Sequence, residues 1–123
     1  MTVIKIKIDA EPIPAARPQF GNGRAFQPLK NREYREVLGW AARQVMKDSP
    51  PLVGALSVVV KLFRRYEKTS RRFGDVDNHL KAIFDGLQGI VFFDDAQIVR
   101  CEVEKHTGSP HTEIEISPAA VSV

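Results

Sequence analysis

The sequence predicts an α+β fold, in which one mixed sheet and two main helices form a single small domain. Three features indicate this class: apolar residues alternate near both ends of the chain, a long apolar run lies in the middle, and two segments have helical apolar spacing. The chain has 123 residues, of which 43% are hydrophobic. That length suffices for one hydrophobic core and is short for two, so residues 1–123 are expected to form one domain.

The N-terminal part is expected to contain a strand, a long loop and a helix. Isoleucines alternate with lysines over residues 4–8, which is typical of a half-buried strand. Four prolines in residues 11–30 exclude a regular helix and predict an extended basic loop with a turn at its GNG sequence. A helical pattern then runs from Asn31 to the residues before Pro50. Its apolar positions are Tyr34, Val37, Leu38, Ala41, Ala42 and Val45.

The middle of the chain is expected to contain a strand and a second helix. The apolar, β-branched run of residues 52–64 predicts a central strand. The second helix should begin with Asp77 or Asn78 as its N-cap and end near Gly86 and Gly89. Its expected inner face consists of Leu80, Ile83, Phe84 and Leu87.

The C-terminal part is expected to form a β-hairpin. Residues 98–106 and 111–117 both alternate, and turn-forming residues join them. Cys101 is the only cysteine, which excludes an internal disulfide and a metal site built from thiolates. Because Cys101 lies between Val99 and Val103 in the alternating pattern, it is expected to be a small buried side chain and not a nucleophile.

Positive and negative residues are separated along the chain, whose formal net charge is +3. Residues 1–35 carry a net charge of +4 and residues 61–72 a net charge of +5, whereas residues 73–123 carry −6. The basic segments would attract a polyanion, and the acidic segment would repel it unless cations lie between them. Metal-dependent chemistry on phosphodiesters requires this combination.

The sequence GDVDNHLKAIFDGL, residues 74–87, contains the main candidate site. Asp75 and Asp77 are two residues apart, and such residues point to the same side of an extended backbone. Two adjacent carboxylates must take up protons or share a cation, and Mg²⁺ prefers oxygen ligands. Lys81 would bind the scissile phosphate or orient a water molecule. Taken alone, however, an N-cap role for Asp77 and a turn role for Asp75 are the simpler interpretation.

Asp94 and Asp95 form a second acid pair after the helix. They would join the first pair if the following segment runs back along the sheet; taken alone, they would form an exposed turn. Lys81 also has an alternative role, as the partner of Asp85 in a helical ion pair. The order of basic loop, acid pair, lysine and second acid pair favours a common site. The histidines, which lack ligand spacing and are expected in the core or on the surface, are His79, His106 and His111.

Residues 71–99, RRFGDVDNHLKAIFDGLQGIVFFDDAQIV, resemble the signature of the RusA-type Holliday junction resolvases. That motif consists of basic residues, then D-x-D-N-x-x-K-x-x-x-D-x-L, an apolar stretch, and D-D-x-Q-V or a similar ending. This chain matches each of those positions. The proline-rich segment PIPAARPQF also resembles the N-terminal loop of the family.

The resemblance implies a homodimeric, metal-dependent endodeoxyribonuclease that binds four-way DNA junctions in recombination and repair. Such enzymes cut two opposed strands symmetrically with Mg²⁺ or Mn²⁺. The resemblance assigns catalysis and metal binding to Asp75, Asp77 and Asp95, and it makes Lys81 the essential lysine. Asp94 matches the first acid of the second pair and is a further candidate ligand. The motif positions expected to be structural are Asn78 and Asp85.

Basic residues outside the acid motif are expected to contact DNA phosphates, which positions the DNA without reading its bases. These candidates are Arg17, Arg24, Lys30, Arg64, Arg65, Lys68, Arg71 and Arg72. Phe20 and Phe26 are candidates to wedge between base pairs at the crossover, although packing in the core or a loop is the simpler interpretation.

Two other functions remain open from the sequence. A metal-dependent phosphohydrolase of nucleotides would explain the acids and the lysine, but it leaves the net charge of +9 in residues 1–72 without a role. A non-catalytic junction-binding module would use the acids only as helix caps. The chain has no apolar segment near the ~18 residues that a membrane span requires, and its N-terminus alternates, unlike a signal peptide. A cytoplasmic, nucleoid-associated protein, of phage or prophage origin, is therefore expected.

Overall fold

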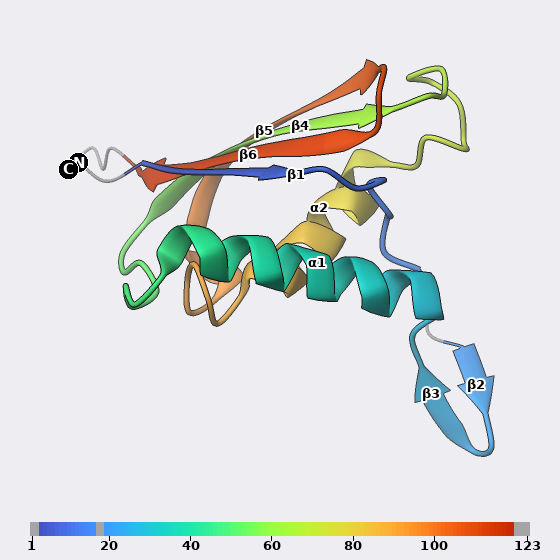
Figure 1. Ribbon diagram of the computed structural model, residues 1–123, viewed down its shortest axis with the longest axis horizontal. Coiled ribbons are helices and arrows are strands. Elements are labelled where there is room, and N and C mark those ends of the chain that lie inside the picture. The colour runs from blue at the N-terminus through green and yellow to red at the C-terminus, as the bar shows by residue number, and fades with distance from the viewer. Residues whose placement is uncertain (1–2, 17–18, 120–123) are drawn as a thin grey trace.

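The computed structural model describes residues 3–16 and 19–119. It contains a four-stranded mixed sheet, a two-stranded hairpin and two α-helices, which lie on one face of the sheet (Figure 1). The expected α+β class with two main helices is confirmed. Within the described ranges, none of the helices combines the length and the apolar character that a membrane crossing would need.

The main sheet has the strand order β1-β6-β4-β5. Its strands are β1 (Ile4–Ile8), β4 (Leu56–Arg64), β5 (Ile98–Thr107) and β6 (His111–Pro118). β4 is antiparallel to β6 and parallel to β5, so the expected central strand is confirmed. The expected hairpin of β5 with β6 is wrong, because β4 lies between them. β4 is almost wholly apolar, whereas β5 carries charged residues that suit the edge of a sheet.

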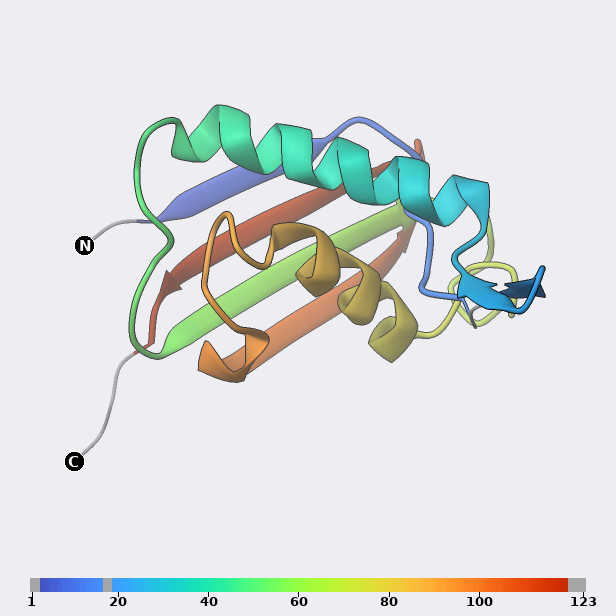
Figure 2. The ribbon, with the colours of Figure 1, turned by 90° about the horizontal axis from the view of Figure 1, so that it is seen from below.

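Both helices cover the face of the sheet that carries the apolar side chains. Helix α1 (Leu29–Met46) lies over β1 and β6, and helix α2 (Val76–Leu87) crosses β4 and β5 (Figure 2). α1 buries Tyr34, Leu38 and Ala42, as expected. The core between helices and sheet includes Ile6, Ile8, Val58, Val60, Leu62, Phe73, Ile83, Leu87, Phe92, Ile114 and Ile116.

Three side chains expected to be buried are exposed. Val37 and Val45 on α1 point partly to solvent, because the buried stripe of this helix is narrower than its apolar pattern. Cys101 is also exposed, contrary to the expectation of a buried position. It lies on the edge strand β5, which α2 crosses obliquely and leaves partly uncovered, so that Val99 nearby is 64% exposed.

The turn expected in the basic loop is confirmed. Strands β2 (Gln19–Gly21) and β3 (Arg24–Phe26) form a hairpin that projects beyond the start of α1 (Figure 1). Its two turn residues, Asn22 and Gly23, have φ values of 52° and 73°. Two positive φ values in a two-residue turn match the twist of the strands, and the Asn-Gly sequence favours them.

Candidate active site

Two buried side chains hold the backbone directly before α2. Arg64, at the end of β4, is 8% exposed, and its Nη1 donates hydrogen bonds to the carbonyl oxygens of Arg72 (3.0 Å) and Phe73 (2.8 Å). His79, which is buried in α2, bonds the Phe73 carbonyl through Nε2 at 2.6 Å. Because both contacts converge on one peptide, they position the chain that leads directly into Asp75.

The N-terminal segment completes this support. Arg64 Nε donates to Glu11 Oε1 at 2.7 Å, which balances the charge of the buried guanidinium. Gly74 has a φ of +94°, and a Cβ added there would lie 2.8 Å from His79 Nε2 and 3.0 Å from Pro14 Cγ. The turn before α2 therefore requires glycine both for its backbone conformation and for its close contacts.

Burial lowers the pKa of the His79 imidazole. The ring is therefore neutral at neutral pH, and Nε2 carries the hydrogen, because the Phe73 carbonyl can only accept. His79 is thus a core residue, which is one of the two roles that its sequence context allowed.

Asp75 and Asp77 lie two residues apart at the start of α2. Asp75 occupies the N-cap position and Asp77 the first turn, so the helix begins earlier than expected. The Asp75 side chain makes no capping hydrogen bond. The Asp77 carboxylate accepts a hydrogen bond from the backbone amide of the next residue, Asn78, at 3.0 Å, which is not a capping bond. Both residues are exposed, so capping does not explain the Asp75 carboxylate.

The arrangement of the two acids differs from expectation in one respect. A loop, and not the end of a strand, precedes Asp75, because β4 ends at Arg64. The positive end of the α2 dipole stabilises carboxylates at this position. Two exposed carboxylates also suit Mg²⁺, which usually binds one or two carboxylates together with waters and phosphate oxygens.

Lys81 lies one helical turn after Asp77 and is exposed. Residues four apart lie on the same side of a helix, so Asp77, Lys81 and Asp85 follow one side of α2. In the described part of the chain, Lys81 forms no ion pair with either acid. The alternative role of Lys81 as the partner of Asp85 is therefore not observed.

A pocket of about 130 Å³ lies beside Lys81, between α1 and α2. Arg32 and Arg35 line it from α1, and Lys81 and Asp85 line it from α2. Neither arginine was predicted as a site residue. Their spacing of three residues on a predicted helix places them on one face, but the sequence does not show that this face meets Lys81.

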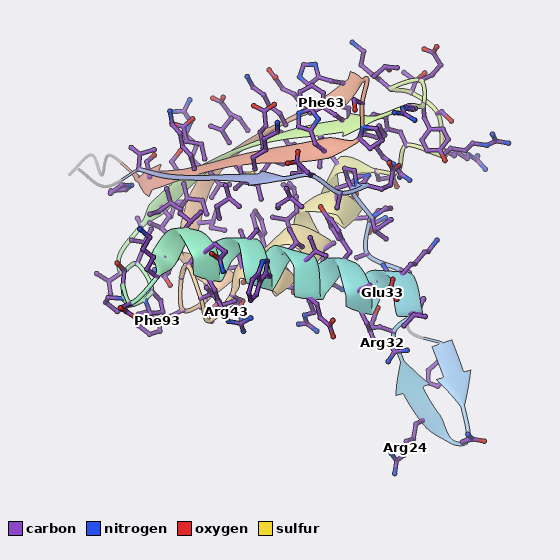
Figure 3. All side chains as sticks on the ribbon, viewed as in Figure 1. Arg24, Arg32, Glu33, Arg43, Phe63 and Phe93 are labelled. Atoms are coloured by element: carbon purple, nitrogen blue, oxygen red, sulfur yellow. The ribbon has the colours of Figure 1, made fainter. Side chains whose placement is uncertain are left out.

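The second acid pair lies at the other end of α2. The Asp94 carboxylate accepts a hydrogen bond from the Ala96 amide at 2.9 Å and caps a short 3-10 helix, η1 (Asp95–Gln97). The Asp95 amide donates a hydrogen bond to the side-chain oxygen of Gln88, the C-cap residue directly after α2. Figure 3 shows Phe93, just before this pair, at the opposite end of α1 from Arg24 on the hairpin.

Within one chain, the expectation that Asp95 joins Asp75 and Asp77 is wrong. The 12 residues of α2 separate its two ends by about 18 Å. The reason is topological: α2 connects the end of β4 to the start of the parallel strand β5, so it must run the length of the sheet. Across residues 3–16 and 19–119, no three His, Cys, Asp or Glu side chains are grouped to hold a metal.

Arg64 is the one predicted DNA contact that the structure contradicts, because this side chain is buried in the support of Asp75. Exposed basic residues remain on the hairpin, in the first turn of α1 and in the loop after β4: Arg24, Lys30, Arg65, Lys68, Arg71 and Arg72. Figure 3 shows Arg24 and Arg32 projecting from the hairpin end of the molecule. Phe20 is 83% exposed, so it is not packed in the core. Arg17 and the side chain of Phe26 lie outside the described residues.

The model of a known protein family, Endodeoxyribonuclease RusA, matches residues 9–117. The chain belongs to the RusA endodeoxyribonuclease family. The matched range contains both acid pairs, Lys81 and the hairpin, and it confirms the resemblance carried by residues 71–99. Membership in the RusA family indicates an endodeoxyribonuclease. The chain is also 26% identical over 138 residues to "Uncharacterized protein YqaN" of Bacillus subtilis strain 168, covering 94% of this chain and 96% of that protein.

Proposed function

We propose that this RusA-family protein is a Mg²⁺-dependent nuclease that resolves four-way DNA junctions by paired, symmetric cuts. One observation carries the proposal: Asp75, an exposed carboxylate without a capping role, stands beside Asp77 at the end of a basic loop. Paired cuts need two such sites, so we also propose that the working form is a homodimer.

Asp75 and Asp77 are the residues that would hold the ion, with Mn²⁺ as a substitute for Mg²⁺. A bound divalent ion would lower the pKa of a water molecule and neutralise charge on the phosphate. The chain itself supplies the placement of these carboxylates. Arg64, His79 and Gly74 fix the backbone before Asp75, so the pair is held in place before DNA arrives.

Lys81 and the pocket beside it would hold the strand to be cut. An ammonium group one turn from Asp77 is placed to contact the scissile phosphate and to offset the charge that develops on it. Arg32 and Arg35, which share the pocket with Lys81, would bind neighbouring phosphates. These contacts orient the DNA backbone and leave its sequence unread.

The hairpin and the loop after β4 would select the branched shape. Their exposed basic residues neutralise phosphates along the arms of the junction. The exposed ring of Phe20 is suited to stack on bases that are unpaired at the crossover.

The test is cleavage of a synthetic four-way junction with Mg²⁺. We expect Asp75→Asn and Lys81→Ala to lose at least about 100-fold in cutting rate, because even groups that only support a metal ligand are worth 10–100-fold. Asp48→Asn, an exposed carboxylate in the turn after α1, is the matched control and should cut normally. Undiminished cutting by either site variant would contradict the assigned roles. Hydrolysis of free nucleotides without junction cutting would indicate a phosphohydrolase instead.

A further inference from the structure

We propose that the pocket between α1 and α2 receives one nucleobase of the bound DNA, which is turned out of the base stack beside the strand that Lys81 contacts. This inference rests on the proposed nuclease function, because it names the part of the substrate that the pocket binds. The pocket has a volume of about 130 Å³. A cavity of about 150 Å³ holds a benzene ring, so one ring of a base fits inside it.

The pocket lies where the hairpin joins the two helices. Ala16 lines it just before the hairpin, and Gln27 lines it just after. Lys81 and Asp85 line it from α2. Figure 3 shows Arg32, a further lining residue, at the end of α1 that adjoins the hairpin. A DNA strand whose phosphate contacts Lys81 would therefore pass the opening of the pocket, with the hairpin next to it.

Hydrogen bonds hold the walls of the pocket in place. The Ala15 amide donates to the Asn78 carbonyl of α2 at 2.9 Å. The Asn31 side-chain nitrogen donates to the Pro14 carbonyl at 2.9 Å, which joins the start of α1 to the same N-terminal segment. A site that is formed before its ligand arrives loses less conformational entropy on binding, so these walls favour the capture of a single small group.

The lining combines apolar surface with hydrogen-bond donors and acceptors. Its half-buried part includes Ile13, Ala15 and Ala82. Its exposed part carries cations, among them Arg35, and the Asp85 carboxylate. An unpaired base has flat faces that stack on guanidinium groups and an edge with both donors and acceptors. Because phosphate has acceptors and no apolar face, the lining is more complementary to a base than to a phosphate.

Two acceptors at the pocket are not paired with described residues. Asp85 forms no ion pair within residues 3–16 and 19–119, although Lys81 lies one helical turn before it. The Asn31 Oδ1 atom is buried and accepts no hydrogen bond from that part of the chain. A buried acceptor without a donor is costly. A phosphate cannot donate to either group, whereas the N–H groups of a base would supply donors.

Occupation of the pocket by a base would favour branched DNA over duplex DNA. Turning a base out of an intact duplex costs stacking and pairing energy, and the cost is smallest where pairing is already broken. Such bases occur at the crossover of a four-way junction. The exposed ring of Phe20, on the hairpin that adjoins the pocket, is suited to fill the gap that the base leaves in the stack.

Free ligands test the pocket without any DNA cutting. We expect thymidine and deoxyadenosine to shift the amide NMR signals of Asn31 and Ala82 with about millimolar dissociation constants, and deoxyribose phosphate to leave them unchanged. Ala16→Phe adds a ring at an exposed lining position and should abolish the nucleoside shifts. The matched control, Ser49→Phe, adds a ring in the turn after α1. Shifts with deoxyribose phosphate alone, or equal nucleoside binding by both variants, would overturn the proposal.

Removal of the Asp85 carboxylate distinguishes a base from a phosphate by the sign of the effect. Asp85→Ala should weaken nucleoside binding about tenfold, because hydrogen bonds to charged groups are strong. A phosphate in the same pocket would instead bind more tightly once the negative charge is gone. Asp48→Ala, at an exposed acid in the turn after α1, should change neither affinity. Nucleoside binding that is unchanged or tighter in Asp85→Ala would contradict a base as the ligand.

The closing experiment observes the base in bound DNA. The fluorescence of 2-aminopurine rises when this base analogue leaves the stack, and we expect a rise when the wild type binds, without metal, a junction that carries it beside the cut position. Ala16→Phe should lose the rise and Ser49→Phe should keep it. If the wild type binds nucleosides in the pocket but fails to cut junctions, the proposed function fails and this inference stands. If it cuts junctions while wild type and Ala16→Phe give the same signal, this inference alone fails.

Discussion

At the scale of single residues, the position of the candidate site depends on two buried side chains and a glycine. Arg64 and His79 both bond the Phe73 carbonyl, and Gly74 allows the chain to turn there. These contacts decide where the Asp75 carboxylate stands. A buried arginine and a buried histidine are costly without partners, so their hydrogen bonds to backbone carbonyls and Glu11 are part of the stability of the fold.

Substituting Gly74 should damage both stability and activity. In Gly74→Ala, the strain of a positive φ and the overlap with His79 together should lower the free energy of unfolding by about 2–4 kcal/mol. Gly54→Ala is the control, because its φ is +80° but its added Cβ meets no atom within 4 Å. It should lose only about 1–2 kcal/mol. Denaturant unfolding measures both values, and equal losses would contradict the steric role of Gly74.

His79 should make the protein less stable in mild acid. Burial holds its pKa in the folded state below the unfolded value of about 6.5, so the unfolded chain binds a proton first as the pH falls. The contribution of His79 is therefore present above about pH 6.5 and is lost below it, by at most ~1.4 kcal/mol per pH unit. Urea unfolding between pH 7 and pH 5 should show this slope. His79→Gln should flatten it, and an unchanged slope in that variant would contradict the role of His79.

At the scale of elements, two adjacent arginines at the end of β4 have different roles. Arg64 points into the support of Asp75, and Arg65 is exposed at the start of the basic loop. Because side chains alternate along a strand, one residue faces the core and the next faces solvent. A run of basic residues is therefore not a uniform DNA-binding surface.

Substitution of the two arginines should have different effects on stability and on DNA binding. Arg64→Ala leaves Glu11 and two carbonyls without their partner and should lower the free energy of unfolding by about 3 kcal/mol. Arg65→Ala should leave stability unchanged and reduce the slope of log binding constant against log salt by about 0.9. Titrations of junction binding over a range of salt concentrations, together with thermal unfolding, measure both. A change in salt slope for a folded Arg64→Ala protein of normal stability would contradict this division.

On the hairpin, the exposed ring of Phe20 should contribute to the recognition of branched DNA. Phe20→Ala should not change stability, because the ring is exposed. Loss of one stacked base should weaken junction binding about tenfold relative to duplex binding, since such stacking contributes about 1–3 kcal/mol. Trp40→Ala, an exposed aromatic residue on α1, is the control. Competition binding with junction and duplex DNA compares them, and an equal effect on both DNAs would argue against a wedge.

At the scale of the whole molecule, the separation of charge sets how the protein responds to metal. The acidic C-terminal part repels DNA that the basic N-terminal part attracts. Removing divalent ions with EDTA should stop cutting and leave junction binding in place. Under these conditions Asp75→Asn should bind the junction more tightly than the wild type, because a repulsive charge is gone. Gel-shift titrations without metal measure this, and weaker binding by Asp75→Asn would contradict it.

Much of the fold could be predicted from local patterns. Alternation identified β1, helical spacing identified α1 and α2, and the Asn-Gly turn identified the hairpin, because each signal depends on neighbouring residues. The position of β4 between β5 and β6 could not be predicted, because a short turn usually joins adjacent strands. The wrong prediction that Cys101 is buried has the same cause, since the burial of this side chain depends on which strand lies at the edge of the sheet.

The sequence by itself determined the family, the two acid pairs and the division of charge, because these are properties of residue type and spacing. Only the tertiary structure decided that α2 holds Asp75 and Asp95 apart, that Arg64 is buried and that Arg32 and Arg35 lie beside Lys81. The physical reason is that a helix joining two parallel strands must span the sheet. Residues that are close along the chain are thereby carried to opposite ends of the molecule, and residues distant along the chain are brought together.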